Sequence, residues 1–190
     1  MADSKVTKKA MADALKQLSV DMPYAKISIG NICKQCNMSR KTFYYHFKDK
    51  EDLVNWIFET EFVAYAREHI YESVWDGVED LLQYFYSNRV FYRKILAHEG
   101  QNSFSLYFNE LIRSVFIQQL QSIIGNTAGR DVQINFIADG MVCMLKRWIA
   151  EAECLPPELL IREIEIGAKA MAAYIAQTLP QKDLSDCEQA

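Results

Sequence analysis

Apolar residues along this 190-residue chain recur mostly at the third or fourth position, the spacing that places them on one face of a helix. The first such run predicts a helix that begins near Asp3 or Ser4 and ends before Pro23, because a residue that precedes proline is pushed out of the helical conformation. Its buried face is expected to contain Val6, Ala10, Met11, Ala14, Leu15 and Leu18. No strand-like alternation lasts more than a few residues, so the pattern predicts an all-α fold of about nine helices.

Polar residues between the next apolar runs predict two short helices and the start of a long one. Ser28 and Ser39 are expected to cap the short helices by accepting a bond from a free backbone N–H, and the second of these helices spans about residues 40–47. Asn37 lies in the turn between them, where it tolerates the left-handed conformation that ends a helix. Asp49 is expected to cap the fourth, long helix.

The remaining pattern consists of helices separated by short breaks. Breaks are expected at Asp76-Gly77, Ser87-Asn88, residues 98–100, residues 125–129 and residues 155–157. The last two helices are expected at about residues 131–152 and 157–179. We therefore divide the chain into a three-helix head at residues 1–50, a larger helical ligand-binding and dimerisation domain at residues 51–180, and a disordered tail at residues 181–190.

Charge is distributed unequally between these parts. Residues 1–50 carry a net charge of +6, whereas the whole chain carries −4 and the remaining residues therefore carry −10. This segregation favours a head that faces nucleic acid, although lysines that only solubilise small helices would give the same balance. The chain shows no secretory signal and no apolar run long enough to span a membrane, so we expect a cytoplasmic protein with reduced cysteines and no membrane partner.

The most informative stretch is SRKTFYYHFKDKEDL at residues 39–53. Phe43 and Phe47 are four residues apart and can form the inner face of a helix. The residues left toward the outside are Arg40, Lys41, Tyr44 and Tyr45. Two short helices joined by a tight turn, the second with a basic first turn, form a helix-turn-helix. The stretch strongly resembles the DNA-binding signature of the tetracycline-repressor (TetR) family, and the resemblance covers about residues 5–55.

The resemblance implies a set of DNA-binding residues on the head. Hydroxyl groups and Lys50 would contact phosphates, whereas Arg40, Lys41 and Tyr45 would reach base edges in the major groove. The implied set is Ser28, Ser39, Arg40, Lys41, Thr42, Tyr44, Tyr45, His46, Lys48 and Lys50. Three departures from the family pattern are Asn37 in place of the turn glycine, Lys41 in place of a small residue, and Asp21-Met22-Pro23 in place of the usual glycine after the first helix.

A narrower resemblance points to the subgroup that contains the activator of dihydroxyacetone kinase operons. It is carried by Phe43-Tyr44, by residues 56–59 (WIFE) and by residues 91–95 (FYRKI). Members of that subgroup can act as activators with a protein co-regulator, so a protein partner is an alternative to a small-molecule effector.

Aromatic residues concentrate in the larger domain, which contains thirteen of the 23 between Phe62 and Phe116. The family resemblance suggests an effector pocket, whereas the composition alone favours an aromatic core for most of them. The candidate pocket residues are Phe62, Trp75, Tyr84, Phe85, Phe104, Phe108 and Trp148.

The last two helices are candidates for a four-helix interface between two subunits, because their small residues let helix axes approach closely. Packing within one chain is the alternative. The candidate interface residues are Ile137, Met141, Met144, Trp148, Gly167, Ala168, Met171 and Ala172. A dimer would present two recognition helices to a palindromic operator on double-stranded DNA.

Other chemistry finds little support. Cys33 and Cys36 form a CxxC with no second ligand pair, the three histidines are far apart, and no phosphate-binding or nucleophile motif occurs. We expect no metal, no cofactor and no catalytic site. The sequence thus predicts a homodimeric transcriptional regulator controlled by a small-molecule effector. The alternatives are an activator controlled by a protein co-regulator, and a helical carrier or enzyme with a vestigial head.

Overall fold

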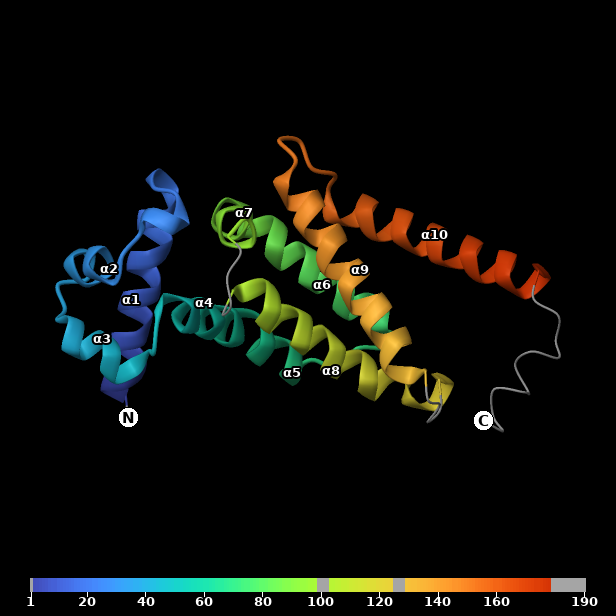
Figure 1. Cartoon of the computed structure of the whole chain (residues 1–190), viewed down its shortest axis with the longest axis horizontal. Helices are drawn as coiled ribbons and strands as arrows, with labels where there is room; N and C mark the ends of the chain where they lie inside the picture. Colours follow the sequence, from blue (N-terminus) through green and yellow to red (C-terminus); the bar gives the residue numbers. More distant parts are fainter. Residues whose placement is uncertain (1, 99–102, 125–128, 179–190) are drawn as a thin grey trace. The chain divides into compact units, whose positions relative to one another are not determined.

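The computed structural model describes residues 2–98, 103–124 and 129–178, and within these ranges every regular element is a helix (Figure 1). The elements are α1 (Ala2–Asp21), η1 (Tyr24–Lys26), α2 (Ile29–Gln35), α3 (Arg40–His46), α4 (Lys50–Phe58), η2 (Glu59–Val63), α5 (Ala64–Glu68), α6 (Val74–Ser87), α7 (Arg89–Leu96), α8 (Phe104–Ile124), α9 (Arg130–Ala150) and α10 (Pro157–Thr178). Because the π-helical turn η2 joins α4 to α5 without a break, the described residues form about nine separate helices. The all-α expectation is confirmed.

Contacts between residues divide the chain into two compact units. The first contains Met1–Ile70 and Ser87–Phe108, and the second contains Tyr71–Tyr86 and Asn109–Ala190. In the first unit, α1 packs against α2, α3, α4 and α7. The boundary expected at residue 50 separates a DNA-contacting segment from the rest of the chain, and it stays a prediction. The expected tail, residues 181–190, lies outside the described residues.

The three predicted caps of the head are present. Ser28, Ser39 and Asp49 each accept a hydrogen bond from the backbone N–H of the third residue after them. At the first of these helices the bond is reciprocal: the Asn31 side chain accepts from the backbone N–H of Ser28 and completes a capping box. Asn37 has a φ of 52°, the left-handed conformation expected for the turn between α2 and α3. Local sequence chemistry therefore fixes the ends of these helices.

Several expected features differ in the structure. Asp76 and Gly77 lie inside α6 rather than at a break. The Ser73 hydroxyl accepts from the backbone N–H of Asp76, and the Asp76 carboxylate accepts from the backbone N–H of Ser73, so this pair caps the helix before these residues. Val6 is 67% exposed instead of buried, and α1 begins at Ala2, before the residues expected to cap it. The break at Ser87-Asn88 is present between α6 and α7, and the one before Pro157 between α9 and α10; the other two fall partly outside the described residues.

Apolar side chains from several helices form the interior of each unit. In the first, Met11, Leu15, Ile32 and Phe43 are buried between the helices of the head. Phe58 of α4 is also buried and has the rings of Phe62, Tyr92, Phe104, Tyr107 and Phe108 around it. Burying a side chain of this size contributes about 1.5 to 3 kcal/mol, so these positions hold α4 firmly against its neighbours.

Candidate nucleic-acid interface

The two faces of α3 separate by chemistry. Phe43 and Phe47 are buried and their ring centroids lie 5.7 Å apart, so they attach the helix to the head. On the other side, Arg40, Lys41 and Tyr45 are exposed, and the Tyr45 side chain is 83% accessible. The helix therefore offers guanidinium, ammonium and phenol groups to the solvent on a rigid apolar support, as the sequence predicts.

The other candidate groups of this face are arranged around those three. Tyr44 and Lys48 are exposed, and His46 is partly covered with its ring 4.9 Å from that of Tyr45. The hydroxyls of Ser39 and Thr42 lie 2.8 Å apart and bond to each other. These two hydroxyls and that of Ser28 are thus engaged in shaping helix starts.

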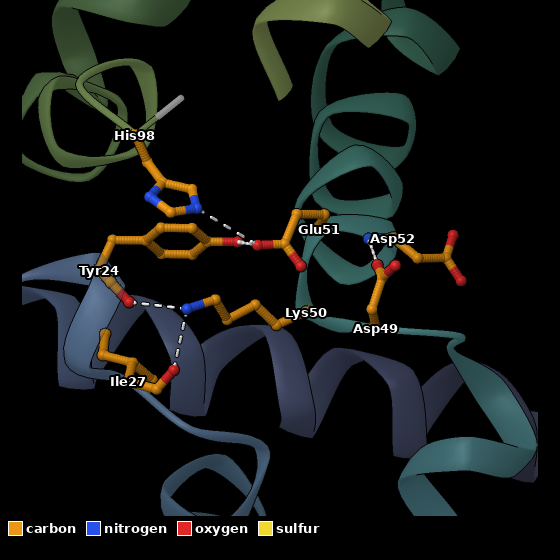
Figure 2. Close-up of polar contacts among 7 residues, drawn as sticks. All are labelled: Tyr24, Ile27, Asp49, Lys50, Glu51, Asp52 and His98. Atoms are coloured by element: carbon orange, nitrogen blue, oxygen red, sulfur yellow. Dashed lines mark hydrogen bonds and ion pairs between the residues drawn. The ribbon is translucent and has the colours of Figure 1, made fainter. Parts of the chain in front are cut away.

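Lys50 has partners inside the first unit (Figure 2). Its Nζ donates to the carbonyl oxygen of Tyr24 at 2.9 Å and to that of Ile27 at 3.0 Å, and it lies 4.1 Å from the centroid of the Tyr24 ring. An ammonium group has three N–H donors, so at most one remains for an outside acceptor. Lys50 is partly buried, and this burial lowers the pKa of its ammonium group. These contacts oppose the expected phosphate contact, which stays untested.

Tyr24 is the centre of the same cluster. Its hydroxyl donates to Glu51 Oε1 at 3.2 Å, and its ring meets that of His98 edge to face at 5.3 Å. His98 Nε2 lies 3.9 Å from the same Glu51 oxygen (Figure 2). Burial, and then the charge of Glu51, raises the pKa of Tyr24 well above its usual range. The phenol therefore stays protonated and keeps its bond to the carboxylate.

Lys94 of α7 binds the end of α1 in a similar way. Its Nζ donates to the carbonyl oxygens of Val20 at 2.8 Å and Met22 at 3.3 Å, and to that of Ser19. The last carbonyls of a helix lack partners within the helix and carry partial negative charge, so a cation there is stabilising. Two lysines from different helices thus hold the segment from Ser19 to Ile27. Sequence reasoning missed this role, because the partners of each lysine lie far away along the chain.

The candidate pocket residues do not gather in one unit. Phe62, Phe104 and Phe108 lie in the first unit, where all three pack around Phe58. The other four candidates, Trp75, Tyr84, Phe85 and Trp148, lie in the second unit. Phe85, Phe104 and Phe108 are fully buried, which fits the core alternative for these positions. An effector pocket stays a prediction.

The candidate interface residues fall into three groups. Gly167, Ala168, Met171 and Ala172 are exposed on α10. Ile137, Met141 and Met144 are partly buried on α9. Trp148 is only 4% exposed, and its indole N–H donates to the carbonyl of Leu155 at 2.9 Å, so its side chain belongs to the interior of its own unit.

A different face of α9 carries the exposed apolar residues. Val132 is exposed, Phe136 is 81% exposed, and a Cβ atom added at Gly140 would meet nothing within 4 Å. Cys143 is exposed near the same face. The interface residues expected from the sequence lie on another face of α9, which also has apolar residues at helical spacing, and they stay a prediction.

The CxxC cysteines are thiols within α2 and at its end. Cys33 is buried and Cys36 is partly buried, and burial raises the pKa of both thiols. Raised pKa values keep them protonated and poorly reactive. Within residues 2–98, 103–124 and 129–178, no three His, Cys, Asp or Glu side chains gather in a way that could hold a metal ion. No helix of these ranges is long and apolar enough to cross a membrane.

Comparison with known proteins identifies the class to which this head belongs. Residues 12–57 match the family described as bacterial regulatory proteins, tetR family, and residues 72–169 match the family described as transcriptional regulator C-terminal region. The second match covers more than half of the chain. The chain therefore belongs to the TetR family, and it is a DNA-binding transcriptional regulator.

Particular relatives narrow the subgroup. The HTH-type dhaKLM operon transcriptional activator DhaS of Lactococcus lactis subsp. lactis (strain IL1403) is 30% identical over 122 residues, which are 63% of this chain and 65% of the relative. The match thus spans slightly less than two thirds of that relative's length. A solved structure of the dihydroxyacetone kinase operon activator DhaS has a TM-score of 0.62 at 25% identity and covers 87% of this chain and 96% of its own. The narrower resemblance to this subgroup is confirmed.

A further solved structure shares the fold. A TetR transcriptional regulator from Streptococcus agalactiae 2603V has a TM-score of 0.66 at 21% identity, and the alignment covers 85% of this chain and 93% of that structure.

Proposed function

We propose that the exposed face of α3 enters the major groove of operator DNA and carries the sequence readout. The supporting observation is the position of Arg40, Lys41 and Tyr45, which are exposed on a helix whose opposite face is anchored by Phe43 and Phe47. Arginine and lysine pair with guanine O6 and N7, and a tyrosine can contact base edges or the phosphate backbone. Tyr44, His46, Lys48 and the hydroxyls of Ser28, Ser39 and Thr42 are proposed to contact or position the backbone.

Binding to selected duplexes tests this proposal. Sequences bound by the chain would first be selected from random duplex DNA, and affinities for the selected and for random duplexes would then be compared. Lys41→Ala and Tyr45→Ala should reduce the preference for the selected sequence, whereas Lys48→Ala should weaken both affinities alike and flatten the salt dependence by about 0.9. Arg67→Ala is the matched control, because it removes an exposed charge from the same unit away from α3. Equal losses for Lys41→Ala on both duplexes would remove Lys41 from base readout.

We further propose that two chains associate through α10 and through the exposed face of α9 that carries Val132 and Phe136. In one chain, Met171 is 61% exposed, and Ile166, Tyr174 and Ile175 are also exposed on α10, with Phe136 exposed on α9. So much apolar area on two helices is costly in water and is the usual mark of a contact surface. A two-fold dimer would present two copies of α3 at a spacing of about 34 Å and so match a palindromic operator.

Sedimentation of a surface variant tests the dimer. Met171→Glu with Ile175→Glu should produce monomers, because two carboxylates would be buried without partners in the interface. Glu163→Gln, an exposed polar change on the same helix, should leave the dimer intact. A second readout is the thiol of Cys143, which should react faster with a labelling reagent in the monomeric variant. Dimers that survive the double substitution would place the interface elsewhere.

The direction of regulation is proposed to be activation. The relative from Lactococcus lactis and the solved structure described above are both named as activators of a dihydroxyacetone kinase operon. Effector control is typical of the family, and we propose it here. A small molecule is the first candidate for the effector, and a co-regulator protein is the second. A protein that binds the chromosome would act in the cytoplasm.

Reporter transcription from the selected operator tests activation, since transcription should rise when the chain is supplied together with its effector. Activity restored by added small metabolites would identify a small molecule, whereas activity that requires a second purified protein would identify a co-regulator. Repression of the reporter under every condition would contradict activation. A head that binds no duplex even at low salt would favour the carrier or enzyme alternative.

A further inference from the structure

We infer that Gly30 is a specificity-determining position. Because Gly30 has no side chain, the Arg40 guanidinium can lie against α2, and this contact orients it for one guanine edge of the operator. The inference rests on the proposed function of α3 and concerns how one of its side chains is aimed. Gly30 itself is not among the DNA-binding residues implied by the family resemblance.

Gly30 and the guanidinium of Arg40 lie close together. A Cβ atom added at Gly30 would lie 2.7 Å from Arg40 Nη2 and 3.5 Å from both Cζ and Nε. Three atoms of the guanidinium therefore lie against the space that a side chain at residue 30 would fill. The charge of Arg40 also reaches Cys33, one turn further along α2, where it opposes the rise in the thiol pKa that burial causes.

The N–H groups of the Arg40 guanidinium are free to donate in this position. Within the described part of the chain, the guanidinium of Arg40 has no hydrogen-bond or ion-pair partner, so its five N–H donors are available to an outside acceptor. A guanidinium that rests on a neighbouring helix loses less freedom on binding than one that sweeps through solvent. The planar fork matches the O6 and N7 acceptors of guanine in the major groove.

Both residues are poor choices for the local structure. Glycine within a helix is destabilising relative to alanine, and Gly30 lies in the first turn of α2. Arg40 is the first residue of α3, where the helix dipole disfavours a cation. Gly30 and Arg40 thus both go against helix preference, and folding brings them into contact in the head. We take this combination to indicate a functional requirement.

The test is a double-mutant cycle on the full-length chain with the selected and random duplexes. Gly30→Ala displaces only the far end of a flexible side chain, so its Tm should equal that of the wild type or rise by a few degrees. Arg40→Ala should reduce the preference for the selected duplex by about 5- to 100-fold, and Gly30→Ala should lose at least about 3-fold of the same preference. In the Arg40→Ala background, the Gly30→Ala change should have no further effect.

The controls separate this inference from the proposed function. Gly77→Ala adds a methyl group within α6, where the new Cβ atom would meet the Tyr71 ring at 3.7 Å, an ordinary van der Waals distance, so it should leave the preference unchanged. Equal losses from Gly30→Ala with and without Arg40 would mean that the new methyl group obstructs the duplex directly, and the inference would be wrong. A Gly30→Ala variant with wild-type preference would also overturn it. A wild-type chain without any sequence preference would instead overturn the proposed function on which the inference rests.

Discussion

Replacing Lys50 with methionine tests whether this lysine holds the head together or contacts DNA. Methionine keeps an unbranched apolar stem of similar length but removes the ammonium group. The wild-type Nζ donates to the carbonyls of Tyr24 and Ile27 at 2.9 and 3.0 Å. The substitution therefore leaves two partly buried carbonyl oxygens without their donor and removes the cation from the face of the Tyr24 ring.

The expected loss of stability follows from these contacts. A hydrogen bond from a charged donor contributes about 1.5 to 3 kcal/mol, and we take the lower limit for each bond because Lys50 is only partly buried. Desolvation of the ammonium, which lowers the pKa of Lys50, offsets part of this gain. The free energy of unfolding should fall by about 2 to 3 kcal/mol, which corresponds to about 4 to 12 °C in Tm for a chain of this size.

The assay combines thermal unfolding with the salt dependence of DNA binding. Lys50→Met should lower the Tm but leave the slope of log K against log salt unchanged, because no phosphate contact is lost. Lys48→Met is the matched control: its side chain is exposed, and its backbone N–H keeps the bond to Asp52 Oδ2 at 2.9 Å. It should keep the Tm and reduce the slope by about 0.9. A Lys50→Met variant with an unchanged Tm and a reduced slope would refute the positioning role.

Three further predictions concern the segments around the head. In urea unfolding, Asn37→Gly should change the free energy of unfolding by less than about 0.5 kcal/mol. Asn37→Val should lower it by about 1 to 2 kcal/mol, because a β-branched residue resists the positive φ. Equal effects of the two substitutions would argue against the left-handed turn. Lys94→Met should cost about 2 kcal/mol and speed amide exchange at the end of α1, and unchanged exchange there would count against its capping role. The pKa values of Tyr24 and Tyr107 are raised by burial and by their carboxylate partners, so the unfolded state loses these protons first and stability should fall as the pH rises above about 10. Tyr24→Phe and Tyr107→Phe should each make that decline less steep, and an unchanged decline would show that the phenols do not cause it.

The sequence by itself determined the local structure of the head and its general chemistry. The caps at Ser28, Ser39 and Asp49 and the turn at Asn37 depend on groups within three residues of one another, so composition and spacing suffice to predict them. The exposed basic face of α3 followed from the positions of Phe43 and its neighbours by the helical period alone.

Tertiary structure decided the partners of groups whose chemistry the sequence shows but whose surroundings it does not. The carbonyls that bind Lys50 lie 26 and 23 residues earlier, and those that bind Lys94 lie 72 to 75 residues away. The sequence also could not decide which face of α9 is buried, because two faces have apolar residues at helical spacing and only packing buries one of them. The same holds for Gly30 and Arg40: a residue without a side chain gains a function only from the group that folding places above it.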